Sequence, residues 1–179
     1  MTDGKALFAS MHPGFFNRFA PDGDESVYEE MLLGLDGYAH AAKDMEGVTF
    51  GLYEGDMAPL LQSVREVDED WAQYYTPESS VYCAMADGRV VSFCLLDDMG
   101  GHEVDGRMAR IAGPGCVGTI PAYRRRGIGL EMVARGTQIL RERGYDYSYI
   151  HYTGVAPWYA KLGYRTILRW NKRGEMEDV

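Results

Sequence analysis

The stretch from Gly115 to Leu130 constrains the fold of this chain more than any other part of its sequence. Its first part, residues 116–120, is rich in β-branched residues, which favours a strand. Pro121 cannot donate to a sheet ladder, so the strand is expected to end there. Three arginines and two glycines follow, and the residues after Gly129 repeat apolar side chains with helical spacing. The sequence therefore predicts a strand, a basic glycine loop and a helix N-terminus in direct succession.

This predicted loop has the properties of a phosphate-binding turn. Backbone N–H groups at a helix start, together with the positive end of the helix dipole, attract anions. Gly127 and Gly129 carry no Cβ, so a ligand can approach the backbone closely. The guanidinium groups of Arg124, Arg125 and Arg126 add positive charge that can pair with phosphate. We interpret the loop as a pyrophosphate-binding site.

The glycine spacing distinguishes this loop from two other phosphate-binding motifs. A P-loop has four residues between its glycines and continues Gly-Lys-Ser/Thr, which is absent from this stretch. A dinucleotide-binding turn needs a third glycine three positions after Gly129, where Met132 stands. The remaining pattern is Arg-x-x-Gly-x-Gly, which is filled by Arg124, Gly127 and Gly129.

Length and composition indicate one domain from a reducing compartment. A chain of 179 residues with 46% apolar residues can bury a sizeable core. No apolar run approaches the roughly 20 residues that span a bilayer, and no basic region followed by an apolar block opens the chain, so we expect no membrane contact and a cytoplasmic location. The cysteines are odd in number and widely spaced, which fits a reduced state. No metal is expected, because metal-ligand spacing is lacking among the histidines, which are His12, His40, His102 and His151.

Charge is divided unevenly along the chain. Residues 1–106 contain 21 acidic and 5 basic side chains, whereas residues 107–179 contain 6 acidic and 13 basic ones. The acidic part argues against nucleic acid as a partner, and the basic part favours an anionic ligand. An uneven surface charge that serves only solubility explains the same division.

The periodicity of the chain predicts alternating strands and helices. We expect a first long helix from Asp22 or Asp24 to about Lys43, because apolar residues recur there at three- and four-residue spacing. Asp87-Gly88 joins two apolar runs as a hairpin, and residues 97–106 form a polar loop or a second hairpin that turns at Asp105-Gly106. The other expected elements are strand 48–53, a helix capped by Asp56, strand 107–120 with a bulge at Gly113-Pro114-Gly115, helix 128–143, strand 145–152, helix 156–162 and strand 164–170.

The phosphate loop and its surroundings resemble the acyl-CoA-binding motif of the GCN5-related N-acetyltransferase (GNAT) family. The likeness includes the lead-in from Thr119 to Arg124 and a second signature, Tyr159-Ala-Lys-Leu-Gly-Tyr164, and it covers about residues 48–170. The resemblance implies an α/β fold with a mixed, mostly antiparallel sheet and helices on both faces. It places the family domain at residues 47–170, after an N-terminal helical extension at 1–46 and before a frayed end at 171–179.

The resemblance also implies an N-acetyltransferase, which moves an acetyl group from its co-substrate acetyl-CoA to an amine by direct attack within a ternary complex. The backbone of Val117, Gly118 and Thr119 would hold the pantetheine arm. Tyr159 would lie by the thioester sulfur and protonate the departing thiolate as general acid, although an aromatic packing role explains this residue as well. The pyrophosphate would be held by Arg124, Arg125, Arg126, Gly127, Ile128 and Gly129.

No motif identifies the general base. An amine acceptor must lose a proton before or during attack, and a histidine such as His151, with an ordinary pKa of about 6.5, suits that task. A histidine that only packs in a strand fits the same pattern. Glu103 and Asp105 are further candidates, and a water chain would leave no trace in the sequence. The family's asparagine before the tyrosine is absent from Tyr152-Thr153-Gly154.

Other functions stay open at the level of sequence. An acyl-CoA-binding regulatory module with weak or no catalysis would keep the same motifs, and a nucleotide-phosphate binder unrelated to CoA would bind ADP as well as CoA. The acidic residues of positions 1–106 favour a cationic small-molecule or peptide amine as acceptor. The N-terminal extension is expected to cover the acceptor side or a subunit interface, so a homodimer is among the expectations.

Overall fold

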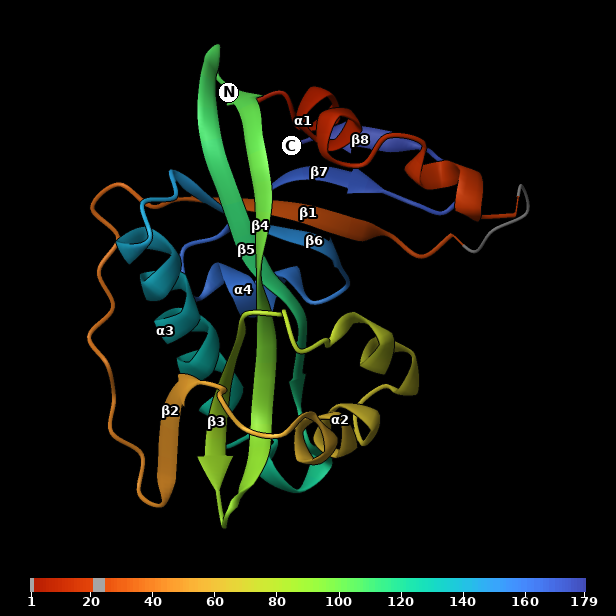
Figure 1. Ribbon diagram of the computed structural model, residues 1–179. Coiled ribbons are helices and arrows are strands. Elements are labelled where there is room, and N and C mark those ends of the chain that lie inside the picture. The colour runs from red at the N-terminus through yellow and green to blue at the C-terminus, as the bar shows by residue number, and fades with distance from the viewer. Residues whose placement is uncertain (1, 21–24) are drawn as a thin grey trace. The chain divides into compact units, whose positions relative to one another are not determined.

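The computed structural model describes residues 2–20 and 25–179. Two tight turns join three consecutive strands of its sheet. Asp87-Gly88 and Asp105-Gly106 have positive φ at both turn positions, 50° and 75° in the first and 50° and 78° in the second. Such turns match the right-handed twist of the strands that they join. They connect β3 (Val81–Ala86), β4 (Arg89–Val104) and β5 (Arg107–Thr119) (Figure 1). Both hairpins are therefore confirmed, and residues 97–104 continue a strand instead of forming a loop.

The described strands form one eight-stranded sheet in the order β2-β3-β4-β5-β6-β1-β7-β8. β5 and β6 pair in parallel, whereas the pairs β1·β6, β1·β7, β2·β3, β3·β4 and β7·β8 are antiparallel. The mixed, mostly antiparallel α/β fold expected from the sequence is thus confirmed. The remaining strands are β1 (Tyr28–Gly34), β2 (Val48–Leu52), β6 (Tyr147–Thr153), β7 (Arg165–Trp170) and β8 (Met176–Asp178).

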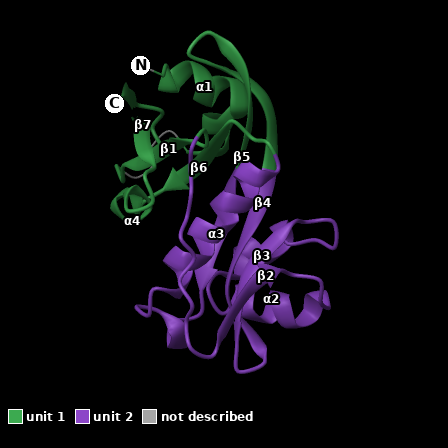
Figure 2. Ribbon diagram, turned by 90° about the vertical axis from the view of Figure 1, so that its left-hand side faces the viewer, with its two compact units in different colours: residues 1–36, 98–112, 144–179 green, residues 37–97, 113–143 purple. Residues whose placement is uncertain are grey.

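The chain divides into two compact units, and neither is continuous in sequence (Figure 2). β4 and β5 run through both units, because each strand has one part on either side of the division. The domain limits expected at residues 47 and 170 coincide with the limits of neither unit. Unit 1 contains Met1–Asp36, Asp98–Ala112 and Gly144–Val179, and unit 2 contains Gly37–Asp97 and Gly113–Arg143.

Unit 2 has helices on both faces of its strands, since neighbouring side chains of a strand point to opposite faces. Its helices are α2 (Met57–Arg65), the 3-10 turn η2 (Glu69–Tyr74) and α3 (Ile128–Glu142), which confirms the helix expected over 128–143. On one face Phe93 of β4 packs in the core with Leu60 and Val64 of α2. On the other face, a Cβ on Gly136 of α3 would meet the side chains of Leu96 and Cys94.

Unit 1 contains α1 (Gly4–Met11), the 3-10 turn η1 (Phe15–Arg18) and α4 (Ala156–Ala160). Asp3 caps α1, because its carboxylate accepts a hydrogen bond from the N–H of Ala6 at 2.8 Å. Phe15 packs edge-on against Phe8 and Trp170, with ring centroids 5.2 and 5.0 Å apart, so aromatic rings connect α1 and η1 to β7. No helix in the described part of the chain is long and apolar enough to cross a membrane.

The helix expected from Asp22 or Asp24 to about Lys43 is wrong. Asp22 and Asp24 lie outside the described residues, residues 28–34 form β1, and residues 35–47 contain no helix. The chain at β1 lies between β6 and β7 and pairs with both. Ladder hydrogen bonds on two edges and the burial of Met31 and Leu32 outweigh the local preference for a helix.

The end of the chain also differs from the frayed segment expected at 171–179. β8 pairs antiparallel with β7: Leu168 lies opposite Asp178, and Trp170 lies opposite Met176. The side chain of Asn171 fastens the turn between them: its amide donates to the Glu175 carboxylate at 2.6 Å, and its oxygen accepts from the N–H of Arg173 at 3.0 Å. A short strand with a side-chain-bridged turn therefore replaces the frayed end.

Candidate functional site

The predicted phosphate loop lies in unit 2 between β5 and α3. β5 ends at Thr119, Pro121 opens the 3-10 turn η3 (Pro121–Tyr123), and α3 begins at Ile128. Gly127 precedes the helix with a φ of 80°, in the left-handed region that glycine tolerates best. The first N–H groups of a helix have no carbonyl partner within it, which suits them to bind an anion. The succession of strand, glycine loop and helix N-terminus is confirmed.

Two of the three arginines in the loop fold back onto its backbone. Nε of Arg124 donates to the carbonyl of Thr119 at 2.9 Å, and Arg126 donates to the carbonyl of Ala122 at 2.9 Å. The Arg126 guanidinium also lies 4.7 Å from the centre of the Tyr123 ring. Each guanidinium carries five N–H donors, so these contacts fix the loop and still leave donors for an anion.

Gly127 and Gly118 differ in what surrounds them. A Cβ on Gly127 would meet nothing within 4 Å, so the loop presents its backbone to open space. A Cβ on Gly118 would lie 2.4 Å from the Phe93 ring, so packing alone requires glycine there. The carbonyl of Gly118 accepts a hydrogen bond from Oγ of Ser92 at 2.8 Å, and Oγ1 of Thr119 lies 2.9 Å from the same hydroxyl. Binding of a pantetheine arm by residues 117–119 stays a prediction.

β5 is irregular just before the residues expected to hold that arm. Cys116 has a φ of 45°, and its carbonyl accepts a hydrogen bond from the Tyr75 hydroxyl at 2.7 Å, so the strand is irregular directly after the segment where a bulge is expected. A Cβ on Gly115 would lie 2.7 Å from Oδ2 of Asp97, so this carboxylate lies against the β5 backbone. Partial burial raises the pKa of Asp97 above its ordinary value. No motif or spacing in the sequence distinguishes Asp97 from the other acidic residues of positions 97–106.

Tyr159 belongs to α4 in unit 1 and is buried, with 7% of its surface exposed. Its ring packs edge-on against Trp158, with centroids 4.8 Å apart, and contacts Tyr164 at 6.0 Å. The hydroxyl of Tyr164 lies 2.7 Å from Oγ of Ser148. Tyr159 therefore has an aromatic packing role, which is one of the two roles that the sequence allows for it. Its role as general acid stays a prediction.

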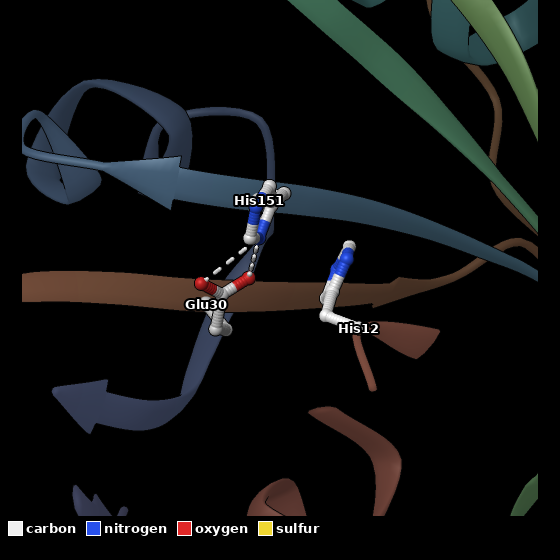
Figure 3. Close-up of side chains that lie close together, drawn as sticks. All are labelled: His12, Glu30 and His151. Carbon is white, nitrogen blue, oxygen red and sulfur yellow. Dashed lines mark hydrogen bonds and ion pairs between the residues drawn. The ribbon is translucent and has the colours of Figure 1, made fainter. Parts of the chain in front are cut away.

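His151 lies on β6 in unit 1 and contacts a buried carboxylate (Figure 3). Its Nδ1 lies 3.0 Å from Oε2 and 3.2 Å from Oε1 of Glu30, which comes from β1 and is fully buried. Oε1 also accepts hydrogen bonds from the N–H of Tyr152 at 3.1 Å and from the indole N–H of Trp170 at 2.6 Å. A carboxylate held by these donors fixes the orientation of the imidazole beside it.

His12, the residue that follows α1, stacks on His151 with ring centroids 3.9 Å apart and an angle of 21° between the planes. Burial lowers the pKa of His12 to about 4, and the neighbouring charges of His151, Arg18 and His102 act in the same direction. Nε2 of His12 is a buried side-chain atom with no hydrogen-bond partner within the described ranges. Polar groups thus gather around His151 from several segments.

The sequence indicates His151 as a candidate base, but it does not connect His12 or Glu30 with that residue. Glu30 lies 121 positions away, and His12 lies in a segment without clear periodicity, so no spacing connects them to His151. A strand assignment for residues 28–34 could have brought Glu30 beside β6. The other candidates, Glu103 at the end of β4 and Asp105 in the following turn, are exposed.

Comparison with known proteins supports this description of the fold and the loop. The sequence model of the family described as "Acetyltransferase (GNAT) domain" matches residues 52–167. A search of curated proteins finds no matching sequence. The family match contains both the loop at 124–129 and the signature at 159–164.

Several solved structures share the fold. A glucosamine N-acetyltransferase region of a fungal multi-domain β-N-acetylglucosaminidase superposes with a TM-score of 0.68 at 22% identity, over 88% of this chain and 21% of that one. A GCN5-related N-acetyltransferase from Sphaerobacter thermophilus gives 0.59 at 20% identity, over 96% of this chain and 58% of that one. One from Kribbella flavida gives 0.56 at 20% identity, over 79% and 55%.

The chain thus spans between 21% and 58% of the length of these proteins, and at such identity the likeness shows the fold. The family match carries more weight, because it covers more than half of the chain and includes the loop at 124–129. The fold and the domain indicate an acetyltransferase. This chain belongs to the GCN5-related N-acetyltransferase family.

Proposed function

We propose that this protein transfers an acetyl group from acetyl-CoA to an amine by direct attack within a ternary complex. The observation that carries the proposal is the loop from Arg124 to Gly129, because it combines an open glycine backbone, surface guanidinium groups and the N-terminus of α3. Such a site suits a pyrophosphate in both charge and hydrogen bonding. Membership of the family supports acyl-CoA as the ligand.

The pairing of β5, the strand before the loop, supports the proposal that residues 117–119 bind the pantetheine arm. In the described pairing of β5 with β6, Ile111 lies opposite Tyr147 and Ala112 lies opposite Ser148, and both of these pairs belong to unit 1. Residues 117–119 lie outside this ladder, after the irregular Cys116. Extended backbone can bind the amide groups of a ligand as it binds a neighbouring strand. We therefore assign the arm to Val117, Gly118 and Thr119.

The proposed reaction needs one acid and one base. The amine nitrogen forms a bond to the thioester carbonyl carbon, the carbon–sulfur bond breaks, and an acetylated amine and CoA result. The departing thiolate takes a proton, which we assign to the hydroxyl of Tyr159, and the amine gives a proton to the base. The packing of the Tyr159 ring supports a fixed position for that hydroxyl.

Two residues are candidates for the base. His151 has an imidazole oriented by Glu30, and a neutral imidazole can accept a proton. Asp97 lies against Gly115, two residues before Val117, and its raised pKa makes it a stronger proton acceptor than an ordinary carboxylate. His151→Gln and Asp97→Asn separate the two, because only loss of the base removes the acid-side limb of the kcat/KM profile against pH.

The acceptor that we propose is a cationic amine. Residues 1–106 hold 21 acidic and 5 basic side chains, and acidic surfaces raise the local concentration of cations. The similar fungal region is named for glucosamine, an amino sugar, so amino sugars join polyamines and lysine-rich peptides as acceptors to be tested.

Release of free thiol from acetyl-CoA, measured with a panel of amines, tests the proposed function. We expect release that depends on one class of cationic amine, and we expect mass spectrometry to find that amine acetylated. Acetyl-CoA binding without thiol release for any amine would instead support an acyl-CoA-binding regulatory module. Equal affinity for ADP and CoA would contradict the acyl-CoA assignment.

A further inference from the structure

Unit 1 contains a cluster of three side chains that can ligate a metal: His12 after α1, Glu30 on β1 and His151 on β6 (Figure 3). One ligand atom from each residue lies within 4.8 Å of the other two. It is the one such group that residues 2–20 and 25–179 form. The proposed acetyl transfer gives no role to His12, and a metal ion on His151 would occupy the lone pair that a base needs and leave Asp97 as the base candidate.

We propose that these three side chains bind a divalent metal ion of the zinc type. Two imidazole nitrogens and one carboxylate oxygen form a ligand set that zinc accepts, with the fourth position left for water or another ligand. Imidazole also suits cobalt, nickel and copper, whereas calcium and magnesium prefer oxygen ligands. The composition of the cluster therefore selects the class of metal.

The two oxygens of Glu30 are held differently. Oε1 accepts hydrogen bonds from the N–H of Tyr152 and the indole N–H of Trp170, at 3.1 and 2.6 Å. Nδ1 of His151 lies 3.0 Å from Oε2 and 3.2 Å from Oε1. A carboxylate whose other oxygen is already hydrogen-bonded is oriented before a metal arrives, as is common around metal sites. We assign Oε2 as the metal ligand.

His12 provides a second, independent observation. Its Nε2 is buried without a hydrogen-bond partner in the described part of the chain, which is unfavourable for a polar atom. The ring stacks on His151 with centroids 3.9 Å apart, so both imidazoles already lie in one small region. A metal ion would give Nε2 the partner that it lacks.

Binding requires the His12 ring to leave its stack on His151, because imidazole lone pairs lie in the ring planes and cannot both point at one ion while the rings are stacked. Zinc bonds of about 2.0–2.2 Å place tetrahedral ligand atoms roughly 3.3–3.6 Å apart, which is closer than the outer limit of 4.8 Å for this cluster. His12 caps the end of α1 through its backbone, whose N–H donates to the carbonyl of Phe8. A turn of the side chain about its own bonds leaves that backbone hydrogen bond in place.

The expectation of no metal rests on sequence spacing, and spacing cannot detect this cluster. Zinc motifs usually place pairs of ligands a few residues apart. Here β1 enters the sheet between β6 and β7 and brings Glu30 to His151 across 121 positions. The proposed ligands are thus brought together by the order of the strands in the sheet and not by their spacing in the sequence.

Metal titration of the full-length, untagged chain tests the proposal. After dialysis against a chelator, we expect calorimetry to give one Zn²⁺ per chain, and Co²⁺ to give the visible absorption of a four-coordinate ion. His12→Gln removes one ligand and keeps a polar side chain. It should weaken zinc binding by more than the roughly 10- to 100-fold that loss of a residue orienting a ligand costs. His151→Gln should do the same at the second imidazole.

His102→Gln is the matched control, because both nitrogens of His102 are engaged. Nδ1 lies 2.7 Å from Oγ of Ser10, and Nε2 lies 2.8 Å from the carbonyl of Met99. This variant should keep the zinc affinity of the unchanged chain. No binding to the unchanged chain, or equal affinity in all three variants, would overturn the proposal. Metal binding is measured directly, so the result does not depend on acetyl transfer.

Discussion

At the scale of single residues, the loop before α3 depends on Gly127, whose φ of 80° and open surroundings leave room for a ligand. An aspartate there would bring a Cβ and a negative charge to the expected place of the pyrophosphate. We expect Gly127→Asp to abolish measurable acetyl-CoA binding in calorimetry while circular dichroism shows that the fold persists. The backbone strain of a side chain in the left-handed region adds up to roughly 1–2 kcal/mol of destabilisation.

Gly37→Asp separates the effect on the ligand from that strain. Gly37 has a φ of 70°, and a Cβ there would also meet nothing within 4 Å. The substitution adds the same charge and a similar strain to unit 2, but outside the loop. Acetyl-CoA affinity as low in Gly37→Asp as in Gly127→Asp would contradict the assigned site.

Tyr159 is the residue on which the proposed chemistry depends. Tyr159→Phe keeps the ring that packs against Trp158 and removes the hydroxyl. Loss of a positioned acid typically costs roughly 100- to 10,000-fold in rate, so we expect a drop of that size in turnover with little change in acetyl-CoA binding. Tyr164→Phe removes a hydroxyl from the neighbouring buried ring and is the control. Unchanged turnover in Tyr159→Phe, measured where chemistry limits the rate, would exclude Tyr159 as the acid.

At the scale of elements, the first turn of α3 is tied to the segment before β2 through Glu131. Its carboxylate accepts hydrogen bonds from the N–H of Lys43 at 2.8 Å and from Nε of Arg135 at 2.7 Å, and it lies 3.0 Å from Nε2 of His40. Burial acts to raise the pKa of Glu131, but these hydrogen bonds outweigh it, and the pKa is lowered from 4.5. The ionised carboxylate therefore stabilises the fold above that ordinary value.

This stabilisation is lost as the pH falls through the lowered pKa of the folded state. Glu131→Gln should be less stable than the unchanged chain near neutral pH, and the difference should shrink as the pH falls below 4.5. Urea denaturation at a series of pH values measures it. Glu142→Gln, an exposed position at the other end of α3, should show no such trend. A stability difference that is constant with pH would mean that Glu131 is not the titrating group.

The elements that could be predicted from the sequence are those specified by neighbouring residues. Asp87-Gly88 determines its hairpin through two positive φ angles, and α3 follows from apolar spacing after a glycine loop. β1 could not be predicted, because it is stabilised by pairing with β6 and β7, whose residues lie more than 100 positions away. The contacts of Glu30 with His151 and Trp170 depend on that pairing, so the residues adjacent to Glu30 in the sequence could not predict them either.

At the scale of the whole molecule, the division of charge predicts a response to salt. If the acidic residues of positions 1–106 attract a cationic acceptor, kcat/KM for that acceptor should fall as ionic strength rises, because the Debye length shrinks to about 8 Å at physiological salt. Acetyl-CoA is kept saturating at each salt concentration, so that weaker binding of its pyrophosphate does not contribute. A flat kcat/KM, or a preference for acidic acceptors, would contradict the prediction.

β1 is made long before the strands that flank it. It ends at Gly34, whereas β6 begins at Tyr147 and β7 at Arg165. At a synthesis rate of about 5–20 residues per second, the ribosome needs roughly 6–23 s to reach β6 after it has finished β1. During that time the apolar Met31 and Leu32, which are buried in the finished sheet, have no strand beside them. We therefore expect unit 1 to close only after β7 has been synthesised, with Met31 and Leu32 exposed until then.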